Sequence, residues 1–351
     1  MWFQQFARPL LFRIEPERAH RLTIRMLKRK PLSGALTGGG PADDPVLATT
    51  VGGLIFPNPV GLAAGVDKNA EAPLAFLDLG FGFAEVGTLT PHPQKGNPRP
   101  RIFRLEEDRA IINRLGFNNQ GQDAAIARLK LYARRPGPIG VNIGANRDSP
   151  DRIADYAGGA RAMCPYADYL TVNISSPNTP GLRALQDKAM LEALLAAVIE
   201  NNSHQCPVFL KVAPDLKPAD IADIAEVAIA HGVAALIVSN TTISRPTLRS
   251  RHADEAGGLS GAPLAPLAAE RLAGFRHVCG GALPLIAAGG VGSGADAYAR
   301  IRAGASLVQL YTALIYEGPD LGRRIADDLA DLLKRDGFAS VAEAVGVDAR
   351  A

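Results

Sequence analysis

The chain has 351 residues, 47% of them hydrophobic and 21% charged, with a formal net charge of +3. This length allows one large domain or two ordinary ones, and the composition is that of a soluble globular protein. Cys164, Cys206 and Cys279 lie far apart without a metal-ligand spacing, which excludes a disulfide framework and a structural zinc site and indicates a reducing compartment.

The positive charge is concentrated at the N-terminus. Residues 1–30 contain eight basic and two acidic side chains, a formal charge of +6, so the remaining chain carries −3. Apolar side chains recur at near-helical spacing in residues 1–13 and again after Pro16, which suits a first helical turn. These two short helices could lie on an anionic membrane surface, gaining about 1 kcal/mol per basic residue, or pack on the domain with their charges in water.

We expect neither a membrane span nor a signal peptide in this arm. A run of about 18 apolar residues is absent from the sequence, and Arg8 and Arg13 interrupt what would be the apolar part of a secretory signal. The Gly- and Pro-rich residues 32–45 are predicted to be a linker. Residues 46–56, with Gly52-Gly53 at the centre, are predicted to form a β-hairpin that plugs one end of the domain.

After the hairpin, short apolar runs alternate with helical patterns, which is typical of a (β/α)8 TIM barrel with parallel strands. The predicted strands are 60–64, 83–88, 139–143, 169–174, 208–212, 235–239, 283–288 and 307–311, and helices are predicted at 120–134, 189–201, 219–231 and 296–303. A doubly wound open sheet also alternates in this way, but no G-x-G-x-x-G turn follows the first strand. We therefore predict the α/β class, with a helical arm at 1–40 and a barrel at 41–351.

One connection is too long for a plain βα turn. Residues 91–119 contain strand-like pieces at 101–105 and 110–113 around an acidic turn at 106–108. They are predicted to form a β-excursion that could fold over the mouth of the barrel.

Uncharged polar side chains gather at the end of the fourth predicted strand, where Pro177 and Pro180 stop the strand. They are Asn173, Ser175, Ser176, Asn178 and Thr179. Such groups donate and accept hydrogen bonds without charge, which suits a neutral, planar, amide-rich ligand, and the carboxyl ends of the strands are where barrels carry active sites. A polar loop that only caps turns has the same composition.

Other strand ends carry related groups. Lys68 follows the first strand and could pair with a ligand carboxylate, whereas Lys211 ends an apolar strand and is costly to bury without a negative partner. The edge of a flavin, which becomes anionic on reduction, would be such a partner.

Glycine-rich segments at 257–261 and 289–294 follow strands six and seven. Loops of this composition expose backbone N–H groups, which predicts a phosphate site. The absence of a Walker A sequence favours a mononucleotide such as FMN over ATP.

Several segments together resemble the dihydroorotate dehydrogenases, specifically the quinone-dependent, membrane-associated class. The likeness covers nearly the whole chain and includes A-A-G-V-D-K, I-N-R-L-G-F-N-N, V-N-I-S-S-P-N-T-P-G-L-R, L-K-V-A-P-D, G-G-L-S-G and R-A-G-A-S-L-V-Q-L-Y-T-A-L. It implies an FMN enzyme of pyrimidine biosynthesis that oxidises (S)-dihydroorotate to orotate and reduces ubiquinone or menaquinone. It also implies a monomer attached peripherally to the cytoplasmic side of the cell membrane through the arm.

The resemblance also implies residue roles, with Ser176 as the catalytic base where the soluble class carries Cys. Dihydroorotate would contact Lys68, Asn113, Arg114, Leu115, Gly116, Phe117, Asn173, Asn178, Asn240 and Thr241. FMN would contact Ala64, Gly65, Val66, Asp67, Lys68, Thr88, Asn142, Asn173, Lys211, Ser239, Gly261, Gly290, Tyr311 and Thr312. The quinone would contact His20, Arg104 and Tyr311.

Serine is a weak base at neutral pH and no histidine sits beside Ser176 in the sequence, so proton removal needs desolvation or a relay, for which Thr179 and a water under Phe117 are candidates.

Two other functions remain open. One is the soluble class of dihydroorotate dehydrogenase using fumarate or NAD, which Ser176 and the arm oppose. The other is a non-enzymatic binder of nucleic acid or membrane, although the aromatic residues of the arm suit lipid better than base stacking, and we expect no nucleic-acid partner and no metal.

Overall fold

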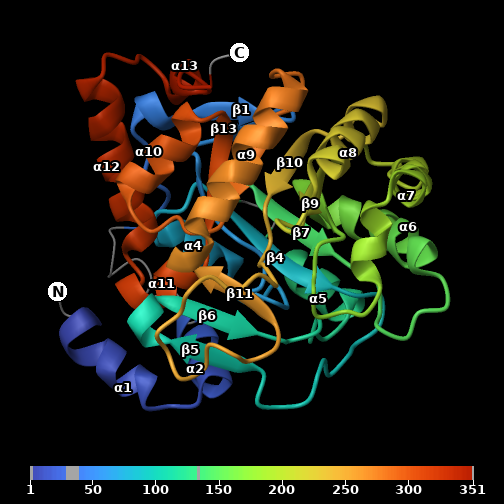
Figure 1. The fold of residues 1–351 in the computed structure, drawn as a ribbon, viewed down its shortest axis with the longest axis horizontal. Coiled ribbons are helices and arrows are strands. Elements are labelled where there is room, and N and C mark those ends of the chain that lie inside the picture. Colours follow the sequence, from blue (N-terminus) through green and yellow to red (C-terminus); the bar gives the residue numbers. More distant parts are fainter. Residues whose placement is uncertain (1–2, 29–38, 133–134, 350–351) are drawn as a thin grey trace.

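The computed structural model describes residues 3–28, 39–132 and 135–349. Eight parallel strands close a barrel in which neighbours along the chain are neighbours in space, so the predicted (β/α)8 fold is confirmed (Figure 1). The strands are β3 (Val60–Leu62), β4 (Phe83–Leu89), β7 (Ile139–Ile143), β8 (Tyr169–Asn173), β9 (Val208–Val212), β10 (Ala235–Val238), β12 (Leu285–Ala288) and β13 (Ala305–Leu310). Nearly every strand residue is buried, which is why each strand reads as a continuous apolar run.

Helices surround the barrel. They are α4 (Pro73–Asp78), α5 (Gln122–Leu129), α6 (Arg152–Met163), α7 (Lys188–Glu200), α8 (Pro218–Ala230), α9 (Ala265–Cys279), α10 (Gly294–Arg302), α11 (Thr312–Glu317), α12 (Leu321–Arg335) and α13 (Val341–Ala344), with the short 3₁₀ helices η2 (Pro45–Leu47), η3 (Glu106–Asp108), η4 (Cys164–Tyr166), η5 (Leu182–Gln186) and η6 (Ala262–Leu264). Three of the four predicted helices occur within two residues of their predicted bounds. The fourth, predicted to run to residue 134, ends at Leu129 because the N–H groups of Leu131 and Tyr132 bond to carbonyls three residues back; residues 133–134 lie outside the described residues.

The predicted hairpin exists as β1 (Thr49–Val51) and β2 (Leu54–Phe56), which pair antiparallel. Phe56 packs edge-on against Phe83 inside the barrel, with ring centroids 5.1 Å apart, and both belong to the apolar cluster that fills the amino-terminal end of the barrel. Neighbouring Gly61 leaves room for this filling, since a Cβ there would lie 2.1 Å from the Phe83 ring. The hairpin therefore plugs the end of the barrel opposite the arm, as predicted (Figure 1).

The excursion forms β5 (Ile102–Leu105) and β6 (Ala110–Asn113), as predicted, and a third strand, β11 (Gly258–Gly261), joins them. The prediction that residues 257–261 form a loop is therefore wrong, because residues 258–261 are a strand. Leu259 is buried with apolar residues of β5 and β6, and its N–H group donates to the Thr242 carbonyl. Ser260 and Gly261 line the larger cavity described below, and their contact with a phosphate stays a prediction.

The arm comprises the π-helical turn η1 (Phe3–Ala7), α1 (Arg8–Phe12) and α2 (Pro16–Leu27), and it lies against the excursion sheet (Figure 1). Pro16 occupies the first turn of α2, and the Glu15 side chain accepts from two N–H groups of that turn at 2.9 Å. Trp2 and residues 32–38 of the predicted linker lie outside the described residues. In the described part of the chain, the helices are too short or too polar to cross a membrane.

Candidate active site at the carboxyl ends of the strands

A cavity of about 800 Å³ extends from the arm to the carboxyl ends of the barrel strands. Its outer part is lined by apolar side chains of α1 and α2, and its inner part by the ends of β3, β9, β10, β12 and β13. A smaller cavity of about 120 Å³ lies beside it, under the loop that carries Ser176. The two cavities share Ala64, Asn113, Leu115, Lys211, Asn240, Thr241 and Tyr311. One continuous space therefore joins the arm to the polar strand ends.

Most residues singled out in the sequence line one of these two cavities. The smaller cavity holds Lys68, Thr88, Gly65, Gly116, Phe117, Asn173, Ser176 and Asn178 as well as the shared residues. The larger cavity holds Val66, Ser239, Gly261, Gly290, Thr312, His20 and Arg104. The continuous space thus has a small polar part beside Ser176 and a large, mostly apolar part that reaches the arm.

Three predicted site residues do not line either cavity. Asp67 is buried beneath the site, where its carboxylate accepts from the N–H groups of residues 69, 71 and 72. Arg114 turns away to pair with Glu255 at 2.7 Å and to stack on the Phe103 ring. Asn142 is fully buried behind Thr88, whose hydroxyl donates to it at 2.6 Å. These three side chains can therefore support the site without touching a ligand.

The polar side chains at the strand ends form one chain of hydrogen bonds. Asn173 Nδ2 donates to Thr88 Oγ1 at 3.0 Å and to Asn142 Oδ1 at 3.1 Å. Asn173 Oδ1 accepts from the Ser175 hydroxyl at 2.7 Å, and Ser175 Oγ accepts from Asn240 Nδ2 at 2.9 Å. Because each amide is oriented by a neighbour, the chain presents a preorganised surface to a ligand.

The sequence analysis did not identify Glu85, whose carboxylate holds one end of this hydrogen-bond network in place. Glu85 of β4 is fully buried inside the barrel, and its Oε1 accepts from Asn142 Nδ2 at 2.8 Å. Its Oε2 accepts from Gln309 at 2.8 Å, Thr171 at 3.0 Å and Tyr169 at 3.3 Å. An acidic residue inside the apolar run F-A-E-V-G was the available signal, because a buried carboxylate needs several donors.

Two lysines bring positive charge to the cavities. Burial lowers the pKa of Lys211, while the nearby Glu85 carboxylate opposes this effect. Within the described residues, the Lys211 ammonium group makes no hydrogen bond or ion pair, although its side chain is only 5% exposed. Burial lowers the pKa of Lys68 to about 8, although Glu17 raises it, and its Nζ donates to the Gly65 carbonyl at 2.5 Å. Both lysines are suited to an anionic partner in the cavity.

Ser176 is 5% exposed and faces the smaller cavity, where its Oγ accepts from the Asn178 N–H at 3.2 Å. Thr179 is also buried, but in the part of the chain that the structure describes no hydrogen bond joins its hydroxyl to Ser176. The Ser176 hydroxyl is therefore largely shielded from solvent, and both its role as a base and the Thr179 relay remain predictions.

The glycine-rich segment after β12 does form a loop, unlike the segment after β10. Residues 289–293 line the larger cavity, and α10 begins directly after them with Ser293 as its N-cap. Gly290 has a φ of +72°, and a Cβ there would lie 2.4 Å from Ala265. The loop therefore brings backbone close to the cavity, as a phosphate site requires.

His20 is half-buried and lines the larger cavity from the arm. Burial and the nearby Lys68 keep the pKa of His20 well below its usual value, although Glu17 and the Val66 backbone raise it, so the imidazole is neutral at pH 7. Arg104 donates to the carbonyls of Phe12 and Ile14, at 3.2 and 3.0 Å, and its guanidinium lies 4.6 Å from the Phe12 ring centroid. Arg104 therefore holds the turn between α1 and α2 against the excursion sheet.

A closed (β/α)8 barrel whose strand ends combine amides, two lysines, a glycine-rich loop and an apolar entrance defines a barrel protein with its ligand site at the carboxyl ends of the strands. The sequence model of the family named dihydroorotate dehydrogenase matches residues 46–333. The chain belongs to this family.

Relatives match over almost their full length. The dihydroorotate dehydrogenase (quinone) of Sphingopyxis alaskensis is 61% identical over 348 residues, covering 98% of this chain and 96% of the relative. That of Erythrobacter litoralis is 59% identical over 340 residues, covering 97% and 98%. A crystal structure of the Eimeria tenella DHODH in complex with ferulenol has a TM-score of 0.90 and 42% identity, covering 96% of each chain. Its ligand-free form has a TM-score of 0.89 and 43% identity, covering 96% of this chain and 100% of the other.

Proposed function

We propose that this protein oxidises (S)-dihydroorotate to orotate and transfers the electrons to a membrane quinone, in pyrimidine biosynthesis. The observation that carries the proposal is the continuous space between the arm and the strand ends, with Ser176 at its polar end and apolar helices at its other end. The relatives named as quinone-dependent, at 59% and 61% identity, favour a quinone over the fumarate or NAD used by the soluble class.

The residues present fit FMN as the cofactor. Lys211 offers a buried ammonium group without a partner among the described residues, and Gln309 Oε1 is a buried acceptor without one. The backbone of residues 289–291 lines the cavity beside Thr312 and Tyr311 and could hold one phosphate through its N–H groups, whereas the Gly292 N–H already donates to Asp296 Oδ2 at 3.0 Å. Ala64 and Gly65 leave room for a flat ring against the backbone. When bound, FMN supplies the hydride acceptor for C6 of dihydroorotate and the electron donor for the quinone.

Dihydroorotate occupies the smaller cavity in this proposal. Lys68 binds the substrate carboxylate, and the amides of Asn113, Asn178 and Asn240 match the donors and acceptors on the edges of the pyrimidine ring. Ser176 Oγ, after its own hydroxyl proton has passed to the relay, removes the proton from C5, and the Asn178 N–H that donates to this oxygen stabilises the deprotonated serine before the transfer. Phe117 and the excursion sheet exclude water from this step.

The arm provides the quinone site and the membrane contact. Phe6, Leu10, Leu22 and Met26 are 42–62% exposed and also rim the larger cavity, so a lipid-soluble substrate can enter between α1 and α2. His20, Arg104 and Tyr311 line the same cavity, and we infer that they contact the quinone. We infer a monomer bound peripherally to the cytoplasmic side of the cell membrane, with the arm of residues 1–40 serving a catalytic barrel of residues 41–351.

An acceptor assay tests the proposal. The purified protein is supplied with dihydroorotate and, in separate reactions, a short-chain ubiquinone, a menaquinone, fumarate or NAD, and orotate is measured. Orotate should form with a quinone and not with fumarate or NAD. Turnover with fumarate or NAD but not with quinones would assign the protein to the soluble class.

A further inference from the structure

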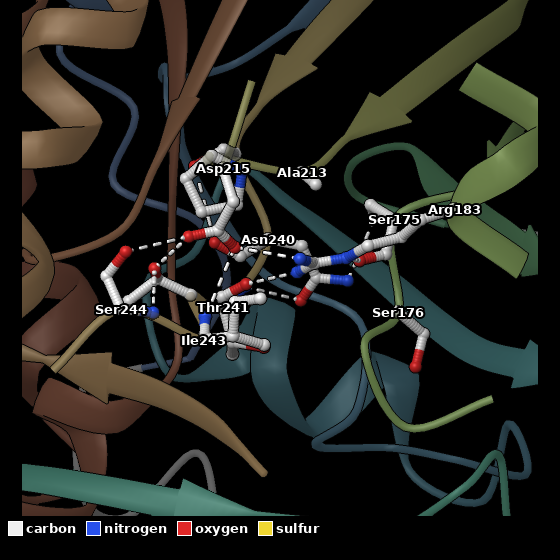
Figure 2. A network of polar contacts seen from close by, with 12 residues as sticks. Ser175, Ser176, Arg183, Ala213, Asp215, Asn240, Thr241, Ile243 and Ser244 are labelled. Carbon is white, nitrogen blue, oxygen red and sulfur yellow. Dashed lines mark hydrogen bonds and ion pairs between the residues drawn. The ribbon is translucent and has the colours of Figure 1, made fainter. Parts of the chain in front are cut away.

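Arg183 joins three loops of the candidate active site. It lies in η5, just after the loop that carries Ser176. Its Nε donates to the Ser175 carbonyl at 3.0 Å, its Nη2 to the Thr241 carbonyl at 3.0 Å, and its Nη1 to Asp215 Oδ2 at 2.8 Å (Figure 2). One guanidinium group therefore connects the segments that follow β8, β9 and β10.

Asp215 extends this connection along the segment after β10. Its Oδ2 also accepts from the Ile243 N–H at 3.1 Å, and its Oδ1 accepts from the hydroxyls of Ser244, at 3.2 Å, and Thr242 (Figure 2). Although burial raises the pKa of Asp215, the hydrogen bonds and the Arg183 charge bring it below its usual value, so the group is ionised at neutral pH. Residues 241–244 are therefore fixed relative to Arg183.

Neither member of this ion pair lines either of the two cavities, so neither is placed to touch a ligand bound there. The groups they hold are placed differently. The Ser175 carbonyl belongs to the peptide bond that leads into Ser176, whose side chain points away from the ion pair (Figure 2) and lines the smaller cavity. The Thr241 side chain lines both cavities. The pair thus sets the distance between the proposed base and the opposite wall of the substrate compartment.

We propose that Arg183 and Asp215 form a positioning pair that fixes Ser176 against Asn240 and Thr241 for proton removal; this inference rests on the proposed function. The planar guanidinium group satisfies two carbonyls and a carboxylate at once, which a lysine ammonium on its flexible stem does not reproduce. Misplacing a reacting group by about 1 Å can cost on the order of 10²-fold in rate, so loss of the pair should slow the chemistry without removing the groups that perform it.

The test compares the two half-reactions of the holoenzyme by stopped flow. Arg183→Ala should lower the rate of flavin reduction by dihydroorotate on the order of 10²-fold, while leaving reoxidation of the reduced enzyme by quinone within about twofold, since the pair is remote from the arm. Arg183→Lys should recover part of the reductive rate. Asp215→Asn keeps the shape of the site and should lower the same rate about tenfold, and it tests the inference if Arg183→Ala does not accumulate.

Arg135 provides a matched control at the amino-terminal end of the barrel. Like Arg183, it pairs with an aspartate, Asp168, at 2.8 Å and donates to two carbonyls, those of Tyr132 and Tyr166, each at 2.8 Å. Arg135→Ala should therefore cost similar stability and leave both half-reactions unchanged. Equal slowing in Arg135→Ala and Arg183→Ala would reduce the role of Arg183 to stability and overturn the inference.

A second readout does not depend on turnover. Hydrogen exchange of the holoenzyme, measured by mass spectrometry, should increase in residues 175–181 and 240–244 of Arg183→Ala and not in those of Arg135→Ala. Unchanged exchange together with a wild-type reductive rate would overturn the inference while the wild-type enzyme still oxidises dihydroorotate. If wild-type flavin is not reduced by dihydroorotate at all, the proposed function fails, and this positioning role fails with it.

Discussion

Glu17 of the arm is clamped by Arg101 of the excursion through two hydrogen bonds, Nε to Oε2 at 3.0 Å and Nη2 to Oε1 at 2.8 Å. Both side chains are almost fully buried, and Arg99 adds a second pair of bonds from a more exposed position. Arg101 also donates to the carbonyls of Lys95 and Asn97, so the clamp ties α2 to the wall of the active site.

Glu17→Gln should weaken docking of the arm. Removing one charge of a buried pair costs about 3–5 kcal/mol, because the other charge is left without compensation. We therefore expect quinone reduction to fall while dihydroorotate still reduces the flavin, which stopped flow can separate. Arg99→Ala is the matched control, and because Arg99 is 54% exposed, its loss should weaken docking of the arm much less than Glu17→Gln does.

The clamp also predicts a pH dependence. Burial raises the pKa of Glu17, but the hydrogen bonds from Arg101 and Arg99 outweigh it and lower this pKa to about 2, from a usual value of 4.5. A lowered carboxyl pKa contributes stability that is complete above pH 4.5 and is lost as the pH falls towards 2. Protease sensitivity of α2 should rise over this interval in the wild type and be high throughout in Glu17→Gln. Equal protection of the two proteins at pH 7 would contradict the clamp.

Orotate binding should weaken at alkaline pH. The pKa of Lys68 is about 8 in the free protein, and a ligand carboxylate prefers the protonated form. The dissociation constant of orotate should therefore rise roughly tenfold between pH 7 and pH 9, measured by titration of the flavin spectrum. Lys68→Arg keeps its charge over this range and should lose the inflection. A similar inflection in both proteins would assign it to another group.

Ser176→Ala should lower the rate of flavin reduction by about 10²–10⁴-fold, the usual contribution of a positioned general base, while FMN remains bound. Ser176→Cys should retain part of the rate, because a thiol can also take a proton and is of similar size. Stopped-flow reduction by dihydroorotate measures both variants. An unchanged rate in Ser176→Ala would refute the role of Ser176 as the base.

The exposed apolar side chains of the arm should bind lipid. Leu10→Asp and Leu22→Asp should each weaken binding to anionic vesicles at least about tenfold, because full burial of a leucine contributes about 1.5–3 kcal/mol. Leu131→Asp is the control, since Leu131 is 76% exposed but lies outside the arm. Vesicle sedimentation measures the binding. An equal loss of binding in all three variants would show that the arm does not contact the membrane.

The barrel could be predicted from the sequence because its strands are buried on both faces and therefore appear as separate apolar runs. Ser176, Asn173 and Lys211 could also be predicted to lie at one rim of the barrel, because the carboxyl ends of all its parallel strands lie on the same side. Strand limits were less accurate: the last strand begins at Ala305, two residues before its predicted start.

What could not be predicted depends on contacts between distant segments. The glycines of β11 are needed for close packing, since a Cβ on Gly258 would lie 2.0 Å from Thr241 Oγ1, and composition alone did not distinguish this from a phosphate loop. Arg114 belongs to a motif that resembles the family, I-N-R-L-G-F-N-N, yet its side chain pairs with Glu255, 141 residues away in the sequence. The clamp of Glu17 by Arg101 and the positioning pair of Arg183 and Asp215 likewise join residues whose pairing has no local sequence signal.

The central claim is that a flavin at the rim of the barrel takes electrons from dihydroorotate and gives them to a quinone through the arm. Anaerobic addition of dihydroorotate to the purified full-length protein, followed by a quinone, tests it most directly by visible absorption. The account predicts a yellow protein that bleaches with dihydroorotate and regains its colour with the quinone. A colourless protein, or a yellow one that dihydroorotate does not bleach, would contradict it.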